Sequence, residues 1–292
     1  MSDTDVALKD IESNFPELKV ASIDYIGEGM DSKAFEVNGA LIFRFPKTQG
    51  VGVQLKVEIR LLPKLRPTLT LRIPDFKYVG NQSNGLPFVG YEKIHGTELT
   101  KNLLDSFTNE DRGVIFKQIA DLLQQIHAFP LDIAKQCGAK EHPFRGNVAL
   151  DFQVLKHEVF PVLAEKEQQY IERLYSNYLS DSGMPNYTPT LIHADLSEEH
   201  ILVDIETKRI TGIIDFGDIC IGDPDYDFMF PYEEYGEEYI RGILRYYPHD
   251  NHDLLFRKLD FYSSAEPPQV AWIAVHRKDN ALLQKTLKQL SN

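Results

Sequence analysis

Short segments that mix apolar and polar residues in alternation fill the first third of the chain. They are rich in β-branched and aromatic residues and cover residues 20–29, 32–39, 40–46, 76–80 and 88–94. Such alternation is typical of half-buried β-strands. Residues 53–65 have helical periodicity instead. The pattern therefore predicts a small antiparallel sheet that carries one helix.

The rest of the chain has a mainly helical pattern. Apolar residues recur at helical spacing in a stripe formed by Ile115, Ile119, Leu122, Leu123 and Ile126. Residues 152–179 are similar, strand-like composition returns at 190–216, and residues 278–290 are again helical in pattern. With no repeat or flexible linker in view, we predict one lobe at residues 1–94 and a second, mainly helical lobe at residues 95–292.

Two acidic motifs flank the strand-like part of the second lobe. HADLSEEH occupies residues 193–200, and IIDFGD occupies residues 213–218. The segment between them predicts a hairpin with His200 opposite Asp215 and with Asp195 just beyond the strand. A register one residue different would place His200 and Asp215 on different faces. A carboxylate that orients a hydroxyl, beside side chains that hold a metal, is the arrangement that phosphoryl transfer needs.

These motifs resemble the catalytic loop and the metal-binding loop of the aminoglycoside phosphotransferases, a family with a protein-kinase-like fold. Further matches are IGEG at 26, FRFPK at 43, FVGYEKIHG at 88 and DPDYD at 223, so most of residues 20–235 is covered. His200 in place of Asn, together with FRFPK and GYEK, is most similar to the aminoglycoside 2''-phosphotransferases. The macrolide 2'-phosphotransferases are similar in having a His there.

The resemblance implies an α+β, bilobal protein-kinase-like fold with a small antiparallel-sheet N-terminal lobe, one main helix in it, and a mainly helical C-terminal lobe. Asp195 would be the catalytic residue that accepts or orients the proton of the substrate hydroxyl. Asp215 and His200 would be the metal residues, with Asp215 the stronger ligand because Mg²⁺ prefers oxygen. His193 is expected to orient the loop through hydrogen bonds.

A buried ion pair is predicted in the first lobe. Arg44 stands where the kinase-like pattern has its phosphate-contacting Lys, and the two side chains differ in shape and hydration. Leu55, Glu58 and Leu62 share the apolar face of the predicted helix, where an unpaired carboxylate would be costly. We therefore expect Glu58 to pair with Arg44; the alternative is a surface Glu on a misjudged helix face. Lys47 is the second candidate cation.

A glycine-containing turn between two predicted strands is the candidate phosphate loop. Gly27 and Gly29 lack side chains, so backbone there can approach a bound phosphate, and Ser32 adds a hydroxyl. Taken alone, two glycines indicate an ordinary hairpin turn. The motifs further along the chain favour the phosphate loop.

FVGYEKIHG resembles the hinge that joins the two lobes of a kinase-like enzyme. By this resemblance, backbone groups of Glu92 and Ile94 pair with the purine of the donor nucleotide. Tyr91 then occupies the gatekeeper position, where a bulky phenol narrows the adenine pocket. GTP is therefore at least as good a candidate for the phosphate donor as ATP. The alternative for Tyr91 is a half-buried strand aromatic.

Four acidic residues are candidates for binding the phosphate acceptor. Carboxylates that line a cleft would pair with the ammonium groups of a cationic sugar. By resemblance, Glu199, Glu233 and Glu234 fall where 2''-phosphotransferases carry acidic substrate contacts, and Asp218 lies next to the metal loop. Solvated surface charges are the alternative for each Glu. Nothing near Trp272 matches the family's late substrate-binding residues.

Three further acids, Asp223, Asp225 and Asp227, surround Pro224. Asp is common before and around Pro in turns and at helix starts. We ascribe all three to turn and helix-capping chemistry.

Composition restricts the partners. The chain of 292 residues carries 31 basic and 44 acidic residues, a net charge of −13, which repels nucleic acid and anionic membranes and attracts cations. The same charge also serves solubility alone. With no long apolar run and an acidic amphipathic start, we expect a cytoplasmic monomer. Cys137 and Cys220 are expected to be free thiols.

The sequence therefore predicts an aminoglycoside O-phosphotransferase that moves the γ-phosphate of GTP or ATP, with Mg²⁺, to the 2''-hydroxyl of an aminoglycoside and so confers antibiotic resistance. A macrolide 2'-phosphotransferase or another small-molecule hydroxyl kinase is the enzymatic alternative. A nucleotide-binding pseudokinase module is the alternative without turnover. The short segment between IIDFGD and DPDYD leaves little room for the activation loop of a protein kinase.

Overall fold

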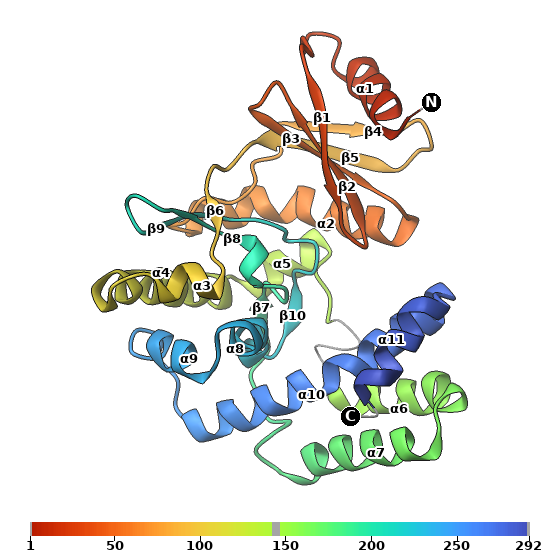
Figure 1. The fold of residues 1–292 in the computed structure, drawn as a ribbon, viewed down its shortest axis with the longest axis vertical. Helices are drawn as coiled ribbons and strands as arrows, with labels where there is room; N and C mark the ends of the chain where they lie inside the picture. The colour runs from red at the N-terminus through yellow and green to blue at the C-terminus, as the bar shows by residue number, and fades with distance from the viewer. Residues whose placement is uncertain (1, 142–146, 291–292) are drawn as a thin grey trace. The chain divides into compact units, whose positions relative to one another are not determined.

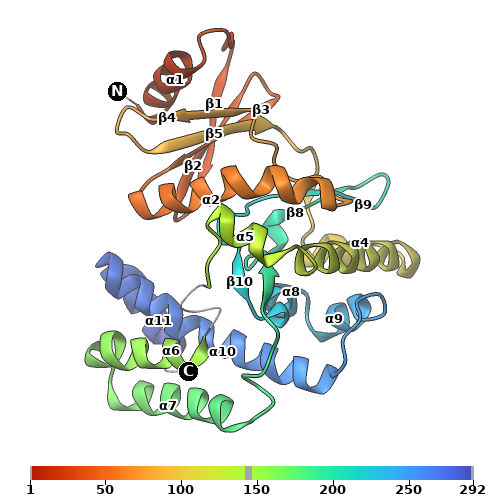
Figure 2. The ribbon, with the colours of Figure 1, turned by 180° about the vertical axis from the view of Figure 1, so that it is seen from behind.

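The computed structural model describes residues 2–141 and 147–290, which form two compact units. The first, here called the sheet unit, contains Met1–Gln118, Asp132–Ala139 and Glu198–Ile219. The second, here called the helical unit, contains Ile119–Leu131, Lys140–Ser197 and Cys220–Asn292. Figures 1 and 2 show the elements of each unit from two sides. The predicted lobe boundary at residue 95 stays a prediction.

An antiparallel sheet of five strands dominates the sheet unit, in the order β1-β2-β3-β5-β4. The strands are β1 (Ile23–Glu28), β2 (Ser32–Val37), β3 (Leu41–Pro46), β4 (Tyr78–Asn81) and β5 (Pro87–Glu92). Each lies in one of the segments where the sequence alternates apolar and polar residues. The predicted strands and their antiparallel arrangement are confirmed.

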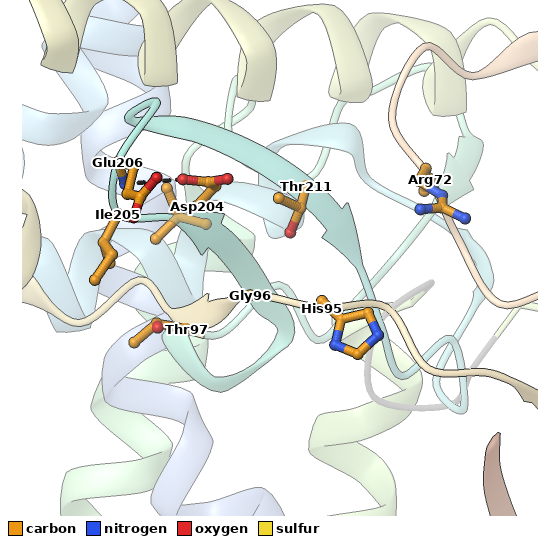
Figure 3. Close-up of a pocket in the computed structure, with 9 residues that line it drawn as sticks. Arg72, His95, Gly96, Thr97, Asp204, Ile205, Glu206 and Thr211 are labelled. Carbon is orange, nitrogen blue, oxygen red and sulfur yellow. Dashed lines mark hydrogen bonds between the residues drawn. The ribbon is translucent and has the colours of Figure 1, made fainter. Parts of the chain in front are cut away.

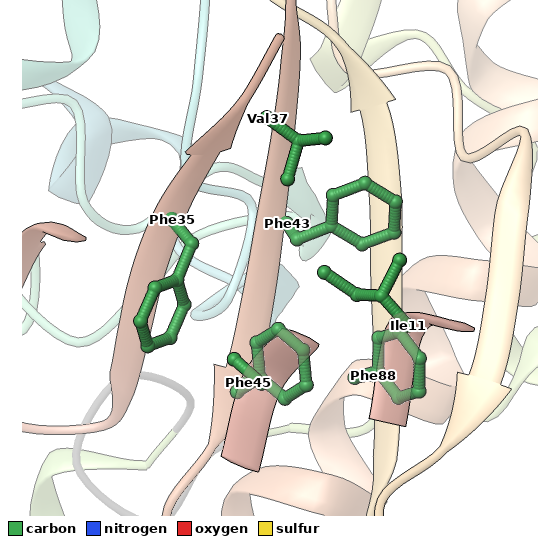
Figure 4. Packing of buried hydrophobic residues seen from close by; sticks show 7 residues of the cluster. Ile11, Phe35, Val37, Phe43, Phe45 and Phe88 are labelled. Atoms are coloured by element: carbon green, nitrogen blue, oxygen red, sulfur yellow. The ribbon is translucent and has the colours of Figure 1, made fainter. Parts of the chain in front are cut away.

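Two helices cover opposite faces of this sheet (Figures 1 and 2). The predicted helix is present as α2 (Gln49–Leu65), which begins at Thr48, whose side chain accepts a hydrogen bond from the Val51 amide. The second, α1 (Asp3–Asn14), begins at a capping box in which Ser2 and Asp5 exchange hydrogen bonds. Apolar residues of α1, β2, β3 and β5 form one core (Figure 4): Ala7, Ile11, Phe35, Val37, Phe43, Phe45 and Phe88.

Aromatic packing in this core requires one glycine. The ring of Phe43 lies over Gly90 of the neighbouring strand, and a Cβ atom at residue 90 would come within 2.4 Å of that ring. The rings of Phe45 and Phe88 stack with their centroids 4.6 Å apart. Such pairs add about 1 kcal/mol to the stabilisation from burial alone. Arg44 lies on the opposite face of the same strands, beside the buried Val89.

A second, three-stranded sheet in the sheet unit carries the predicted hairpin. It contains β6 (Thr97–Glu98), β8 (Ile201–Asp204) and β9 (Arg209–Ile213), preceded by the short helix η4 (Glu198–His200). The Asp204 carboxylate accepts from the amides of Glu206 and Thr207 and stabilises the turn. The helices α3 (Lys101–Asp105), α5 (Leu131–Cys137) and η1 (Arg66–Thr68) lie almost wholly in this unit, and α4 (Asn109–His127) continues from it into the helical unit.

The predicted register of this hairpin is wrong by one residue. Ile201 pairs with Ile213 and the Ile214 amide donates to the His200 carbonyl at 3.0 Å, so His200 lies opposite Ile214 and not Asp215. Next to the turn, Asp204 pairs with Arg209, two residues away from the predicted register, and the bulge between Leu202 and Val203 reduces the difference to one residue at His200, because the facing strand has one extra residue there. A bulge leaves no signal in the apolar pattern of so short a hairpin.

The described residues of the helical unit form six longer helices and a two-stranded sheet, besides the end of α4. The helices are α6 (Val148–Val154), α7 (Glu165–Ser180), α8 (Met229–Tyr235), α9 (Glu237–Ile243), α10 (His252–Arg277) and α11 (Asn280–Leu290). The strands are β7 (Thr190–Ile192) and β10 (Cys220–Gly222), and three short helices are η2 (Leu155–Val159), η3 (Phe160–Val162) and η5 (Pro224–Phe228). The mainly helical second part predicted from the sequence is confirmed.

Both cysteines are free thiols, as predicted, and the structure places both in buried positions. Among residues 2–141 and 147–290, no helix has the length and apolar character needed to cross a membrane.

Candidate active site

Arg44 of β3 contacts two carboxylates. Its Nη1 donates to Asp215 Oδ1 at 2.8 Å, and its Nη2 donates to Glu58 Oε1 of α2. The Arg44 and Glu58 side chains are 14% and 3% exposed, whereas that of Asp215 is 44% exposed. The ion pair between Arg44 and Glu58 that the sequence predicted is therefore present. Within the described part of the chain, Arg44 Nε is buried and has no hydrogen-bond partner.

Burial and charge oppose each other at this ion pair. Burial raises the pKa of Glu58 to about 7, and the contact with Arg44 limits the rise. Burial acts to lower the pKa of Arg44, but the charges of Glu58 and Asp215 outweigh it and raise that pKa. Asp218 also raises the pKa of Glu58 through its charge, which places a third carboxylate near the same guanidinium. Arg44 therefore stays a cation in the middle of an acidic group.

His200 and Asp215 are brought together although the predicted register is wrong. Asp215 has a left-handed backbone with φ of 56°, which is uncommon for a residue with a side chain. This turn redirects its carboxylate as the chain leaves β9, so that His200 Nε2 lies 3.8 Å from Asp215 Oδ2. The Gly217 amide donates to Asp215 Oδ1 and holds the turn. Strained backbone of this kind often marks a functional position.

The glycine loop, defined here as residues 27–32, joins β1 and β2. The Gly29 amide donates to the Ser32 carbonyl, and Ser32 begins β2 opposite Pro46. A Cβ atom at Gly27 or Gly29 would meet nothing within 4 Å, so both glycines face open space. Lys47, which the sequence named as second candidate cation, lies at this loop and donates from Nζ to the Gly29 carbonyl.

Tyr91 lies at the end of β5 on the same face of the sheet as Arg44. Its side chain is buried, and burial raises the pKa of its hydroxyl to about 12. The charges of Arg44, Asp215 and Glu58 all act on that pKa, so the ring lies near the acidic group. Glu92 is exposed and pairs with Lys77 at 2.5 Å. The role of Tyr91 as gatekeeper stays a prediction.

Ile94 is buried behind the predicted hinge, in contrast to the exposed Glu92. A Cβ atom on Gly212 of the hairpin would come within 2.8 Å of the Ile94 side chain, so the two segments pack closely. The pairing of the Glu92 and Ile94 backbone with a purine stays a prediction.

Asp195 lies in the helical unit, on a loop that a buried carboxylate holds by its backbone. Asp227 accepts from the amides of His193 at 3.0 Å and Ala194 at 2.7 Å. The Asp195 amide donates to His193 Nδ1 at 3.3 Å, which is the loop-orienting contact expected of His193. Ala194 has a left-handed φ of 67°, so the loop turns sharply just before Asp195. The Asp195 side chain is half-buried.

A histidine supports the carboxylate that holds this loop. His127 Nε2 contacts Asp227 Oδ2 at 3.0 Å, and His127 Nδ1 contacts the Tyr247 hydroxyl at 2.8 Å. Burial acts to raise the pKa of Asp227, but the contact with His127 and the two amides outweighs it and lowers that pKa. The prediction of turn chemistry for Asp227 is therefore wrong, because the residue anchors a loop more than thirty positions earlier in the chain.

Asp223 and Asp225 surround a buried lysine of α10. Lys258 Nζ lies 2.7 Å from Asp223 Oδ2 and 2.8 Å from Asp225 Oδ2, and its side chain is 3% exposed. Tyr262 donates to Asp223 at 2.7 Å, and His249 Nε2 contacts Asp225 at 3.0 Å. Asp223 also caps η5 by accepting from the Asp225 amide, as predicted. For Asp225 the capping prediction is wrong, because its carboxylate belongs to the buried network.

The candidate acceptor residues divide between the two units. Glu233 lies on α8 in the helical unit, is exposed, and accepts a hydrogen bond from the Ser263 hydroxyl of α10. Glu234 follows it on α8, and its charge raises the pKa of the buried Tyr239. Glu199 is exposed in η4 of the sheet unit. Their roles, and that of Asp218, stay predictions.

Glu266 of α10 is an acid that the sequence reasoning missed. Burial raises its pKa, and the charge of Glu233 raises it further, so two carboxylates from α8 and α10 lie near each other. The charge pattern offered one clue, because Glu266 is an isolated acid in the otherwise uncharged stretch between Asp260 and His276. The helix packing that sets Glu266 beside Glu233 could not be inferred from that clue.

Comparison with known proteins identifies the class of enzyme. Residues 22–262 match the phosphotransferase enzyme family. The chain belongs to this family. The phosphotransferase is 24% identical over 261 residues to the protein YcbJ of Bacillus subtilis (strain 168). The aligned residues cover 85% of this chain and 82% of that protein.

Solved structures agree with this assignment. The GDP complex of wild-type aminoglycoside 2'-phosphotransferase-IIIa is 31% identical, with a TM-score of 0.90 over 99% of this chain and 98% of that one. The GDP and kanamycin complex of an APH(2") enzyme is 31% identical, with a TM-score of 0.89 over 98% and 97% of the two chains. The predicted α+β, kinase-like fold of the phosphotransferase is therefore confirmed.

The side chains suited to Mg²⁺ in this phosphotransferase are Asp215 and His200. In the described residues, no group of three or more His, Cys, Asp and Glu side chains is placed to hold a metal ion. Mg²⁺ is commonly bound through one or two carboxylates together with substrate phosphates, so a complete protein cage is not required. The 44% exposure of Asp215 leaves its carboxylate accessible to such an ion. The pair fits a site that a nucleotide completes.

One pocket of the phosphotransferase does not include Arg44 in its lining. It has a volume of about 660 Å³ and is lined by the hairpin β8–β9, by residues 95–97 and by Arg72. Figure 3 shows Thr97, Asp204, Ile205 and Glu206 around the hairpin turn, with Arg72 at the other end. The pocket holds none of the residues predicted to bind the donor or the acceptor. We therefore assign it no part in the reaction.

Proposed function

We propose that the phosphotransferase moves the γ-phosphate of GTP or ATP to a hydroxyl of an aminoglycoside, at the 2'' position, and thereby confers resistance to that antibiotic. One observation carries the acceptor class: the carboxylates of Glu233 and Glu266 lie near each other, and the pKa of Glu266 is raised by burial and by the negative charge of Glu233. Ammonium groups of a polyamine sugar would supply a compensating positive charge. A relative at 31% identity has been solved with GDP and kanamycin, which supports the same class.

Donor binding would use the face of the five-stranded sheet that carries Arg44. The guanidinium of Arg44 would lie beside the donor phosphates. Its Nε is buried and has no hydrogen-bond partner in the described residues. Glu58 keeps that guanidinium in place through the ion pair. Asp215 and His200 would hold Mg²⁺, which supplies positive charge against the phosphates when bound. Arginine suits this position because its planar fork can contact two oxygens at once.

Proton transfer is assigned to Asp195. Its carboxylate would accept a hydrogen bond from the acceptor hydroxyl and orient that oxygen in line with the γ-phosphate. Asp227 keeps the loop in one conformation through the amides of His193 and Ala194, so little reorganisation is needed when the acceptor binds. Positioning and charge then account for most of the rate enhancement.

Donor choice is assigned to Tyr91. Replacing Tyr91 with Ala should lower the ratio of kcat/KM for GTP to that for ATP about tenfold, because the space freed beside the purine admits adenine better. The measurement is steady-state kinetics with both nucleotides at saturating acceptor. Tyr78→Ala is the matched control, since Tyr78 is a half-buried strand residue that packs against Phe15 and Phe43 on the opposite face. An unchanged ratio in Tyr91→Ala would refute the gatekeeper assignment.

Acceptor binding is tested by removing charge without changing shape. The double variant Glu233→Gln and Glu234→Gln should raise KM for an aminoglycoside about tenfold at low salt, and the difference should shrink as salt screens the remaining attraction. The control is Glu165→Gln with Glu172→Gln, which removes the same charge from exposed positions of α7. If KM rises equally in both double variants, only the overall field matters and the assignment fails.

A substrate panel tests the function as a whole. Aminoglycosides and macrolides should each be offered with GTP and with ATP, and the phosphorylated position should be determined on the product. We expect turnover with aminoglycosides at the 2''-hydroxyl. Turnover with macrolides alone would replace the proposed acceptor, and nucleotide binding without any single-turnover transfer would indicate a pseudokinase.

A further inference from the structure

The glycine loop has little support of its own. Within it, the Gly29 amide donates to the Ser32 carbonyl at 3.1 Å. Space for a Cβ atom is open at both Gly27 and Gly29, and the Met30 side chain is 65% exposed. A loop of this kind would sample many conformations unless something outside it restricts the backbone.

Lys47 supplies such a restriction from the end of β3. Its Nζ donates to the Gly29 carbonyl at 2.7 Å and lies 3.3 Å from Glu28 Oε2. Its own amide donates to the Asp31 carbonyl at 2.9 Å. Lys47 therefore contacts three residues of the loop, and its side chain is only 26% exposed.

The place of Lys47 in the chain links the loop to the Arg44 ion pair. Lys47 follows β3, which carries Arg44, and precedes Thr48, which caps α2, the helix that carries Glu58. The loop is thus tied to the junction of the strand and the helix that hold the guanidinium. A shift of the loop relative to Arg44 would require the Lys47 contacts to break.

We propose that Lys47 is a positioning residue that holds the glycine loop in its phosphate-binding conformation before the donor arrives. The proposal rests on the proposed function, since it assumes that the loop receives the donor phosphates. Lys47 acts through the Gly29 carbonyl, and its own contact with the donor is not required. Holding the loop in advance lowers the ordering cost of donor binding and leaves acceptor binding unaffected.

The test compares Lys47→Gln with Lys33→Gln. Lys33 is a matched control because it lies next to the same loop, is 29% exposed, and pairs with Asp3 of α1. In Lys47→Gln we expect the amides of Gly29 and residue 47 to exchange hydrogen about tenfold faster in the nucleotide-free protein. The donor KM should rise about tenfold, and the acceptor KM should stay within about twofold. Lys33→Gln should leave all three quantities near those of the parent protein.

Two results would overturn the proposal. If exchange at Gly29 and residue 47 is unchanged while the donor KM rises, Lys47 contacts the donor directly and does not position the loop. If exchange accelerates but the affinity for Mg·GDP and Mg·ADP is unchanged, the loop conformation is irrelevant to the donor. The exchange measurement needs no substrate, so its outcome does not depend on the aminoglycoside assignment. A failure of that assignment can therefore be distinguished from a failure of this proposal.

Glu28→Gln separates the two contacts of Lys47 Nζ. This variant removes the ion pair and keeps the hydrogen bond to the Gly29 carbonyl, so the exchange rates and the donor KM should change by less than about twofold. A rise as large as that in Lys47→Gln would show that the surface ion pair holds the loop, against the proposal.

Discussion

Asp195→Ala should lower kcat about a thousandfold while the affinity for the donor nucleotide stays nearly unchanged. The carboxylate is assigned to the acceptor hydroxyl, whereas the donor residues Arg44, Glu58 and Asp215 lie together in the sheet unit. The loop should keep its shape, because Asp227 holds it through the amides of His193 and Ala194, which the substitution leaves in place. Steady-state kinetics and calorimetric titration with Mg·GDP are the two measurements.

The stability of the variant is the control for Asp195→Ala. Its side chain is half-buried, so the melting temperature should change by only a few degrees. Asp195→Asn should be as inactive as the alanine variant, since an amide keeps the shape of the side chain and loses the basic oxygen. Loss of nucleotide affinity in either variant would show that Asp195 has been given the wrong role.

Lys258→Met should destabilise the folded protein by about 3–5 kcal/mol, the usual result of removing one partner from a buried ion pair. Lys258 Nζ lies within 2.8 Å of both Asp223 and Asp225, and both carboxylates are buried. Burial acts to lower the pKa of Lys258, but the two carboxylates outweigh it and raise that pKa, so the ammonium is charged at neutral pH. Its removal leaves two buried negative charges without their cation. Chemical denaturation followed by circular dichroism measures the loss.

Two further variants make the Lys258 prediction specific. Lys156→Met removes a lysine of the same unit that pairs with Glu172 at 3.0 Å with both side chains exposed, and it should cost less than about 1 kcal/mol. Adding Asp225→Asn to Lys258→Met restores the net charge of the network, so the double variant should be more stable than the single one. A loss below about 1 kcal/mol in Lys258→Met would mean that the network contributes little to the fold.

Local patterns were sufficient for the strands, for α2 and for the ion pair between Arg44 and Glu58. Alternation identifies a strand because successive side chains point to opposite faces, and helical spacing placed Glu58 on the apolar side of its helix. A charged residue on an apolar face needs a partner, and Arg44 was the nearest cation of the facing strand. The family could also be recognised from the sequence, because each of its two motifs is a continuous stretch of residues.

Contacts between distant segments were inaccessible from the sequence alone. Asp225 and Asp227 looked like ordinary turn residues. Only the packing of α10 against η5 places Asp225 beside Lys258 in a buried network, and only the fold places Asp227 against the His193 amide. Glu266 lies near Glu233 for the same reason, since the packing of α8 on α10 has no signature in either helix. Which side chains become neighbours in this way depends on tertiary packing, and tertiary packing results from many weak contacts together.

The sequence by itself determined the family and the fold class of this phosphotransferase and the candidate residues for its chemistry, because residue type and spacing already limit what each short motif can do. The tertiary structure alone decided how they meet. His200 reaches Asp215 through a bulge and a left-handed turn, neither of which a hydrophobic pattern encodes. Backbone geometry at single residues depends on the surrounding packing, and that packing exists only once the chain has folded.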